Sequence, residues 1–361
     1  MLTVAAALFV LSLLIIIHEW GHFLAARLCG VRVLRFSIGF GPRIFGKTVG
    51  ETDFCVSAVP LGGYVKLLGE GEEEVPPEWR HRAFSTRPLW QRALIVAAGP
   101  VFNFLLAWLV FTLFFVVKGR PLLLPEVGKV LPESPAARAG LKPGDRILSV
   151  DGVRVRTWEE LTRAVRKHTE RPLLLVLKRG DRTLRIRLRP EVKETRNIFG
   201  ETIRVPVIGI VASGRFETER VAPWSAVWEG LARTLSLIKL TLVAIVKLVE
   251  RVLPLSSLGG PLLIAQMAGQ QAREGFLALL LFAGILSVNL GVINLLPIPM
   301  LDGGHLVFYA VEAVRGRPLS PKTQERIQKV GLALLITLMV LVFYNDLVRL
   351  FPRWVPRIPH P

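Results

Sequence analysis

Three ionisable side chains lie within five residues of an apolar segment near the start of the chain. His18, Glu19 and His22 form an H-E-x-x-H pattern inside the sequence LLIIIHEWGHFLAARL. Because residues i and i+4 share one face of a helix, both imidazoles can hold the same zinc ion. The glutamate can then take a proton from an attacking water. The pattern therefore predicts metal-assisted hydrolysis, with His18 and His22 as metal ligands and Glu19 as the general base.

A catalytic zinc site also needs a third protein ligand and an open position. The late segment NLGVINLLPIPMLDGGH supplies Asp302, shortly after Pro297 and Pro299. Prolines interrupt a membrane helix and free its backbone carbonyls, and an aspartate at such a point is costly unless it has a role. We predict Asp302 as the third ligand. The competing explanation is a carboxylate that only caps the following helix.

The segments around these residues are typical of a membrane protein. The chain has 361 residues, is 51% hydrophobic and carries a formal net charge of +18. Four apolar segments are long enough, or nearly so, to cross about 30 Å of hydrocarbon. They are residues 2–26, 93–117, 276–296 and 330–350. Because the basic residues mostly flank these segments, we expect them to contact a membrane surface and expect no nucleic-acid partner.

Two regions between the apolar segments predict β structure. Residues 35–66 contain short strand patterns with glycine turns, and a strand pair at a membrane must be buried in protein or line a cavity. Residues 121–220 are the one soluble-like block, in which strand, helix and hairpin patterns alternate over the length of one small domain.

The segment 224–253 has two interpretations. It is long enough to be a fifth span, but Glu229, Arg233 and Arg251 lie on one stripe at 100° per residue. Such a stripe favours a helix at the membrane interface. With four spans, Asp302 reaches the same depth as the two histidines, whereas a fifth span would carry it to the opposite face.

The distribution of lysine and arginine predicts the orientation. Residues 27–92 and 315–329 are rich in both, and such segments face the cytoplasm. The N-terminus, the soluble-like block and the C-terminus then lie outside, and the histidines lie near the cytoplasmic face. We therefore expect a multi-pass protein of the plasma membrane.

Together these motifs resemble the site-2 protease family of intramembrane zinc metalloproteases. The resemblance rests on H-E-x-x-H, on N-x-x-P-x-P-x-L-D-G at residues 294–303, and on G-P-x-x-N at Gly99, Pro100 and Asn103. RFSIGFGP, PLGGYVKLLGE and SPAARAGLKPGDRILSVDG are most similar to the bacterial regulator-of-sigma-E protease branch. The last of these is PDZ-like, and this chain contains one such module where some members contain two.

The resemblance implies a set of site residues. One zinc ion per chain is held by His18, His22 and Asp302, with Glu19 as the base. The β-hairpin region helps to hold the substrate, and the prolines that shape the site are Pro297 and Pro299. Four further residues are expected to contact the substrate: Gly62, Gly63, Asn289 and Asn294. For the two asparagines, hydrogen bonding between helices is the competing explanation.

The resemblance also implies a fold. It is a polytopic α-helical membrane protein with four transmembrane helices, a membrane-associated β-hairpin region and one extracytoplasmic PDZ domain. The expected parts are an N-terminal membrane core (1–118), the PDZ-like domain and linker (121–220), interfacial amphipathic helices (222–275) and a C-terminal membrane core (276–361).

The implied function is regulated intramembrane proteolysis in the bacterial inner membrane. The protease would cut the transmembrane segment of a single-pass protein that an upstream site-1-type protease has already trimmed. Anti-sigma factors and remnant signal peptides are the expected substrates. The PDZ-like module would exclude bulky substrates or bind a new C-terminus, and the lack of an evident GLGF-type loop favours exclusion.

Two other functions compete with proteolysis. A catalytically silent membrane scaffold predicts broken metal ligands, whereas His18, Glu19, His22 and Asp302 are all present. An ion or metal transporter predicts polar residues along several spans, and the second and fourth apolar segments contain few.

Overall fold

The structure is a computed structural model in which residues 1–71, 75–167 and 171–350 are described. It divides into two compact units, each taken separately below. The first comprises Met1–Phe114, Val227–Leu248 and Pro254–Pro361, and the second comprises Phe115–Ala226 and Val249–Leu253. The last eleven residues of the predicted C-terminal core, 351–361, lie outside the described residues.

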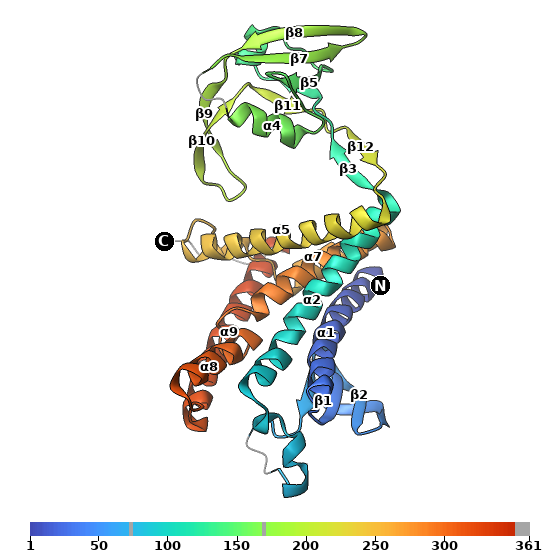
Figure 1. Cartoon of the computed structure of the whole chain (residues 1–361), viewed down its shortest axis with the longest axis vertical. Coiled ribbons are helices and arrows are strands. Elements are labelled where there is room, and N and C mark those ends of the chain that lie inside the picture. Colours follow the sequence, from blue (N-terminus) through green and yellow to red (C-terminus); the bar gives the residue numbers. More distant parts are fainter. Residues whose placement is uncertain (72–74, 168–170, 351–361) are drawn as a thin grey trace. The chain divides into compact units, whose positions relative to one another are not determined.

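Long apolar helices build the first unit (Figure 1). Among the described residues, four helices are long and apolar enough to cross a membrane: α1 (Leu2–Leu28), α2 (Leu89–Lys118), α7 (Phe276–Asn294) and α9 (Pro321–Leu350). They coincide with the four predicted apolar segments, so that prediction is confirmed at the level of helix length and composition.

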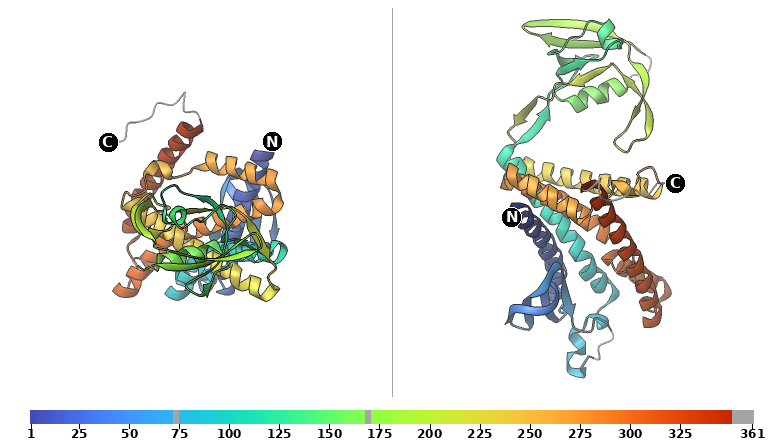
Figure 2. Two further views of the ribbon diagram at one scale, coloured as in Figure 1. Left: turned by 90° about the horizontal axis from the view of Figure 1, so that it is seen from above. Right: turned by 180° about the vertical axis from the view of Figure 1, so that it is seen from behind.

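The ambiguous segment forms α5 (Pro223–Val249), which is not one of these four helices. Both ribbon views show α5 running at a steep angle to α1 and α2 (Figures 1 and 2). This direction, together with its charged residues, supports the interfacial interpretation. The shorter α6 (Pro261–Glu274) packs against α1 and α7 through a core of Ala6, Val10, Leu14, Ala268, Leu279 and Phe282.

A buried carboxylate joins α9 to α6. Asp346 is 1% exposed and accepts hydrogen bonds from the backbone N–H groups of Gly260, Leu262 and Leu263 at 2.9–3.0 Å. These donors lie at the N-terminus of α6, where a helix leaves N–H groups unsatisfied and favours negative charge. Asp346 is therefore a polar residue inside an apolar helix. The N-terminus of the neighbouring helix α6 supplies its hydrogen-bond donors.

The predicted hairpin region is a strand pair that bends back on itself. β1 (Val33–Val49) pairs with β2 (Thr52–Leu67), and Phe36 lies beside both Phe54 and Val65. The first half of β1 therefore has a neighbour on each side. The second half of β1 returns along the start of β2, where Lys47 lies opposite Phe54.

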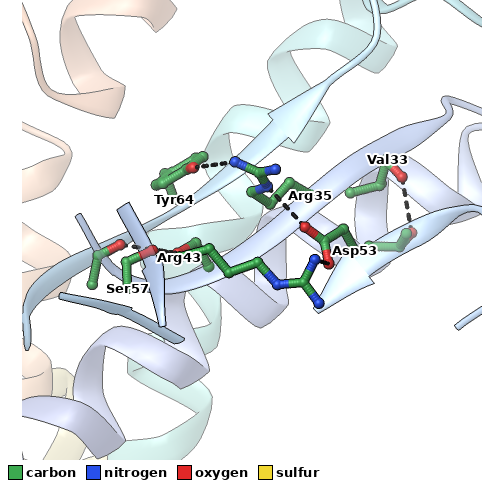
Figure 3. Close-up of polar contacts among 9 residues, drawn as sticks. Val33, Arg35, Arg43, Asp53, Ser57 and Tyr64 are labelled. Atoms are coloured by element: carbon green, nitrogen blue, oxygen red, sulfur yellow. Dashed lines mark hydrogen bonds and ion pairs between the residues drawn. The ribbon is translucent and has the colours of Figure 1, made fainter. Parts of the chain in front are cut away.

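Polar side chains hold these bent strands together (Figure 3). Asp53 accepts from Arg35 Nε at 3.1 Å and forms an ion pair with Arg43 at 3.2 Å. Arg35 also donates to the hydroxyl of Tyr64 at 3.4 Å. These contacts link both halves of β1 with both halves of β2, so the bent sheet keeps its shape beside α1.

The second unit contains the soluble-like block. Its central sheet has the order β6-β5-β7-β8, and the remaining strands form two-stranded pairs. The sheet strands are β5 (Arg146–Val150), β6 (Val153–Arg154), β7 (Leu173–Arg179) and β8 (Arg182–Leu188). The other elements are β3 (Arg120–Leu123), β4 (Val127–Val130), α3 (Pro135–Arg138), α4 (Trp158–Arg166), β9 (Glu191–Arg196), β10 (Thr202–Val207), β11 (Ile210–Ala212) and β12 (Phe216–Glu219).

One ion pair stabilises the core of this unit. Asp145 is fully buried and accepts from Arg179 at 2.7 Å through both carboxylate oxygens, and from the backbone N–H of Lys142 at 2.8 Å. Burial raises the pKa of Asp145, but these hydrogen bonds outweigh it and hold the pKa below its ordinary value. The pair therefore stabilises the fold above the unfolded-state pKa, and this contribution is lost as pH falls through the lowered pKa.

Candidate metal centre

His18, His22 and Asp302 come together in the first unit. The two Nε2 atoms are 3.2 Å apart. Nε2 of His18 lies 3.2 Å from Asp302 Oδ2, and Nε2 of His22 lies 3.6 Å from Asp302 Oδ1. One ligand atom from each residue therefore reaches a common point, although Asp302 follows His22 by most of the length of the chain.

These separations fit a zinc ion. Ligand bonds of about 2.0–2.1 Å at tetrahedral angles place neighbouring ligand atoms about 3.3 Å apart. Within the described parts of the chain, Asp302 Oδ2 is buried without a hydrogen-bond partner, and such an oxygen needs a donor or a cation. The N-cap of α8 (Asp302–Arg315) is Leu301, so the capping explanation for Asp302 finds no support.

The second nitrogen of His22 also favours metal binding. Its Nδ1 lies 2.9 Å from the carbonyl oxygen of Ile95 in α2. A carbonyl only accepts, so Nδ1 carries the hydrogen and Nε2 of the neutral ring presents a free lone pair. That lone pair faces a carboxylate and another imidazole, an arrangement that a divalent cation stabilises.

Helix α2 passes directly behind both imidazoles at Gly99. A Cβ atom on this residue would overlap Nε2 of His22 and would come within 2.8 Å of Cε1 of His18. Only glycine leaves room here for the histidines to turn toward Asp302.

Replacing Gly99 by alanine is therefore expected to weaken zinc binding roughly 10-fold or more, because the added methyl displaces both imidazoles from the ligand geometry. Chelator competition on the purified chain measures the effect. Gly284→Ala in α7 is the matched control, since its Cβ would meet Cγ1 of Val110 at 3.1 Å and has neither histidine among its nearest neighbours. Equal zinc affinity in the Gly99 variant and the wild type would contradict this geometry.

Glu19 lies where α1 meets β2. The backbone N–H of Val65 donates to its carboxylate, which is close enough to His22 and Asp302 for their charges to act on it. A Cβ on Gly63 would be 3.3 Å from Cγ of Glu19, and a Cβ on Gly62 would overlap the ring of Phe40. Gly63 thus lets β2 approach the predicted base closely, whereas Gly62 makes room for the ring of Phe40 in β1.

The segment with the two prolines connects α7 to α8. Helix α7 ends at Asn294, before Pro297 and Pro299, and α8 begins at Asp302. Pro299 packs against α9 at Gly331, where a Cβ would be 2.5 Å from the proline ring. The prolines therefore end α7 and fix the turn that presents Asp302 to the histidines.

The two predicted substrate-binding asparagines lie in different surroundings. Nδ2 of Asn294 lies 3.5 Å from Nε2 of His18, so this side chain is at the site. Oδ1 of Asn289 accepts from the hydroxyl of Thr241 in α5 at 2.8 Å, which is the contact that the helix–helix explanation predicts. Substrate contact remains a prediction for both residues and for the two glycines.

Sequence reasoning named Gly99 and Asn103 only as part of the G-P-x-x-N motif, and it missed the face of α2 on which they support the site. Arg92, Ile95, Gly99 and Asn103 are spaced three, four and four residues apart, which places them on one side of the helix. Arg92 forms a two-pronged ion pair with Glu312 of α8 at 2.5 and 3.1 Å, so α2 also anchors the helix of Asp302. The i, i+3, i+7, i+11 spacing and the G-P-x-x-N motif were the available signals, but neither assigned these residues to the two histidines.

The soluble unit has a groove that sequence reasoning also missed. Its cavity of about 330 Å³ is lined by Trp158, Leu161 and Val165 of α4 and by residues 207–210. The sequence VIGI at 207–210 has the apolar-Gly-apolar order of a GLGF-type loop, at the end of the block. A peptide-binding role for this unit therefore stays open beside exclusion of bulky substrates.

Comparisons with known proteins identify the family of the chain. The model of peptidase family M50 matches residues 6–338. A protein of Agrobacterium fabrum that bears the name zinc metalloprotease is 42% identical over 352 residues, which are 94% of this chain and 93% of that protein. The regulator of sigma-E protease RseP of Salmonella typhimurium is 34% identical over 444 positions, covering 96% of this chain and 98% of its own length. A solved PDZ domain from Listeria monocytogenes matches 24% of this chain and 84% of its own at 23% identity, with a TM-score of 0.20, too low to compare the folds.

Proposed function

The chain belongs to peptidase family M50 and is a zinc metalloprotease, and we propose that it hydrolyses peptide bonds inside the membrane. One observation carries the proposal. His18, His22 and Asp302 converge beside Glu19, on or next to helices long and apolar enough to cross a bilayer. A complete hydrolytic set at such a place has little use unless the substrate is itself in the membrane.

The residues take distinct roles. One zinc ion per chain, held by His18, His22 and Asp302, would polarise the scissile carbonyl and lower the pKa of the attacking water. Glu19 accepts a proton from that water and later gives it to the leaving amine. Asn294, next to His18, donates a hydrogen bond to the substrate backbone.

The strands beside the site support a proposed way of presenting the substrate. Peptide bonds in a helix are hydrogen-bonded internally and shielded, so a transmembrane substrate must unwind before it is cut. An extended segment can add to a strand edge and gain main-chain hydrogen bonds independent of its sequence. We propose that β2 offers such an edge, with Gly63 allowing close backbone approach to Glu19 and with Gly62, next to it in the strand, also contacting the substrate.

The family and the apolar helices support a proposed biological setting. The family and the four apolar helices point to an inner-membrane protein. We propose that its substrates are single-pass proteins of the anti-sigma-factor type and remnant signal peptides, each first cut by an upstream site-1-type protease. In this proposal α5 and α6 lie at the membrane interface, the soluble unit lies outside as a PDZ domain, and the metal centre lies near the cytoplasmic side.

Cleavage in proteoliposomes tests the proposed function. The purified chain should cut a trimmed single-span substrate within its apolar segment. 1,10-Phenanthroline should abolish cleavage and added zinc should restore it, because the metal activates the water. The same substrate with its folded outer domain intact is the matched comparison. It should be cut at roughly one tenth of the rate, or more slowly still. Cleavage that survives metal removal, or occurs only outside the apolar segment, would contradict the proposal.

A further inference from the structure

Asn103 of α2 has an unexplained polar environment. The residue is 0% exposed, and its Nδ2 atom lies 3.1 Å from Nδ1 of His18, on the side of the imidazole away from Asp302. Among the residues that the structure describes, Oδ1 of Asn103 is buried and has no hydrogen-bond partner. A buried amide with an unpaired oxygen is costly, so its orientation matters.

The orientation of this amide decides which nitrogen of His18 carries the hydrogen. Nδ2 can only donate, so with Nδ2 against His18 the Nδ1 atom must accept, and the neutral ring carries its hydrogen on Nε2. Nε2 is the atom that faces His22 and Asp302. A protonated Nε2 has no lone pair for a metal.

Turning the amide by 180° reverses this assignment. The oxygen and nitrogen of an amide side chain exchange places with almost no change of shape. Oδ1 then accepts from Nδ1–H of His18, and the lone pair of Nε2 becomes free for the metal. The turn also gives Oδ1 a donor, and Nδ2 then takes the position at which the described residues offer Oδ1 no partner.

We propose that Asn103 is a positioning residue that makes His18 a metal ligand by accepting its Nδ1–H through the amide oxygen. This inference rests on the proposed zinc site. His22 is held in the same way by the carbonyl of Ile95, about two turns away on the same helix. Helix α2 therefore sets the tautomer of both imidazoles, as outer partners of metal-bound histidines commonly do.

A contact with α7 holds Asn103 in place without involving its amide. The hydroxyl of Ser287, also 0% exposed, donates to the backbone carbonyl of Asn103 at 2.7 Å. Removing this hydroxyl disturbs packing at the same position but leaves the side-chain amide intact. Ser287→Ala is therefore the matched control for a merely structural effect.

The test is the zinc dissociation constant of the full chain in detergent, measured by chelator competition for three variants. Asn103→Leu keeps the approximate shape but removes the acceptor, and should weaken zinc binding about 10- to 100-fold. Asn103→Asp offers only acceptors and should bind zinc at least as tightly as the wild type. Ser287→Ala should stay within about twofold of the wild type.

Each outcome decides between the alternatives. Unchanged zinc affinity in Asn103→Leu overturns the inference. If that variant does not fold, Asn103→Asp decides alone, because a carboxylate cannot donate and would weaken binding if the amide nitrogen were the functional group. A wild-type chain that binds no zinc, or keeps its affinity after His18→Ala, would refute the proposed metal centre itself.

Discussion

Replacing Glu19 by glutamine should lower the rate of peptide hydrolysis on the order of 10³-fold while zinc stays bound. The amide keeps the size and approximate shape of the carboxylate, and Val65 can still hydrogen-bond to its oxygen. It cannot accept the proton of the attacking water at neutral pH. Because Glu19 is not one of the three converging ligands, the metal should remain in place.

The measurement combines cleavage of a single-span substrate in proteoliposomes with zinc analysis of the same preparation. Glu325→Gln is the matched control, since this residue is 60% exposed and pairs with Lys329 one turn along α9. It should cleave at the wild-type rate. Cleavage retained in Glu19→Gln would remove the proposed base from the mechanism, whereas loss of zinc would make it a ligand.

Replacing Asp302 by asparagine should weaken zinc binding, whereas replacing Glu19 should leave it unchanged. We expect zinc affinity to fall on the order of 10²- to 10³-fold, since structural zinc sites gain about 10–16 kcal/mol from four ligands. The variant loses the only negative ligand among the three residues, and a neutral amide oxygen is a much weaker donor. Hydrolysis should fall with the bound zinc.

Chelator competition and cleavage at saturating zinc check this prediction. Asp181→Asn, at an exposed turn between β7 and β8, carries the same substitution away from the site and should change neither quantity. If Asp302→Asn kept wild-type zinc affinity, the carboxylate would have to serve another purpose. The third ligand would then have to be sought elsewhere around the two histidines.

The local chemistry of the site could be predicted from the sequence. His18 and His22 share a face because the helix repeat is fixed, so one turn of α1 determines their relation. The four apolar helices could be predicted from the length and composition of their segments. Both are properties of a continuous stretch of sequence and need no knowledge of distant residues. The end of α7 before Pro297 is equally local, because proline cannot continue the hydrogen-bond ladder.

The relations between distant segments needed the folded chain. Sequence spacing offered Asp302 as a ligand, but only packing of α8 against α1 and α2 brings its carboxylate within 3.2 Å of His18. The partner of Asn289 is Thr241, on a helix whose direction the sequence left undecided. The double pairing of Phe36 likewise has no local signal, since strand register is set by tertiary contacts.

The sequence by itself determined the chemistry that the protein can perform, because the residue types and their spacing along one helix are local properties. Tertiary structure decided whether that chemistry is assembled. Ile95 and Asn103 reach the outer nitrogens of the two histidines only through the rotation of α2 about its axis, a quantity set by side-chain packing over the whole helix interface. No pattern in the sequence reports that rotation, so the partners of the predicted ligands could be found only in the fold.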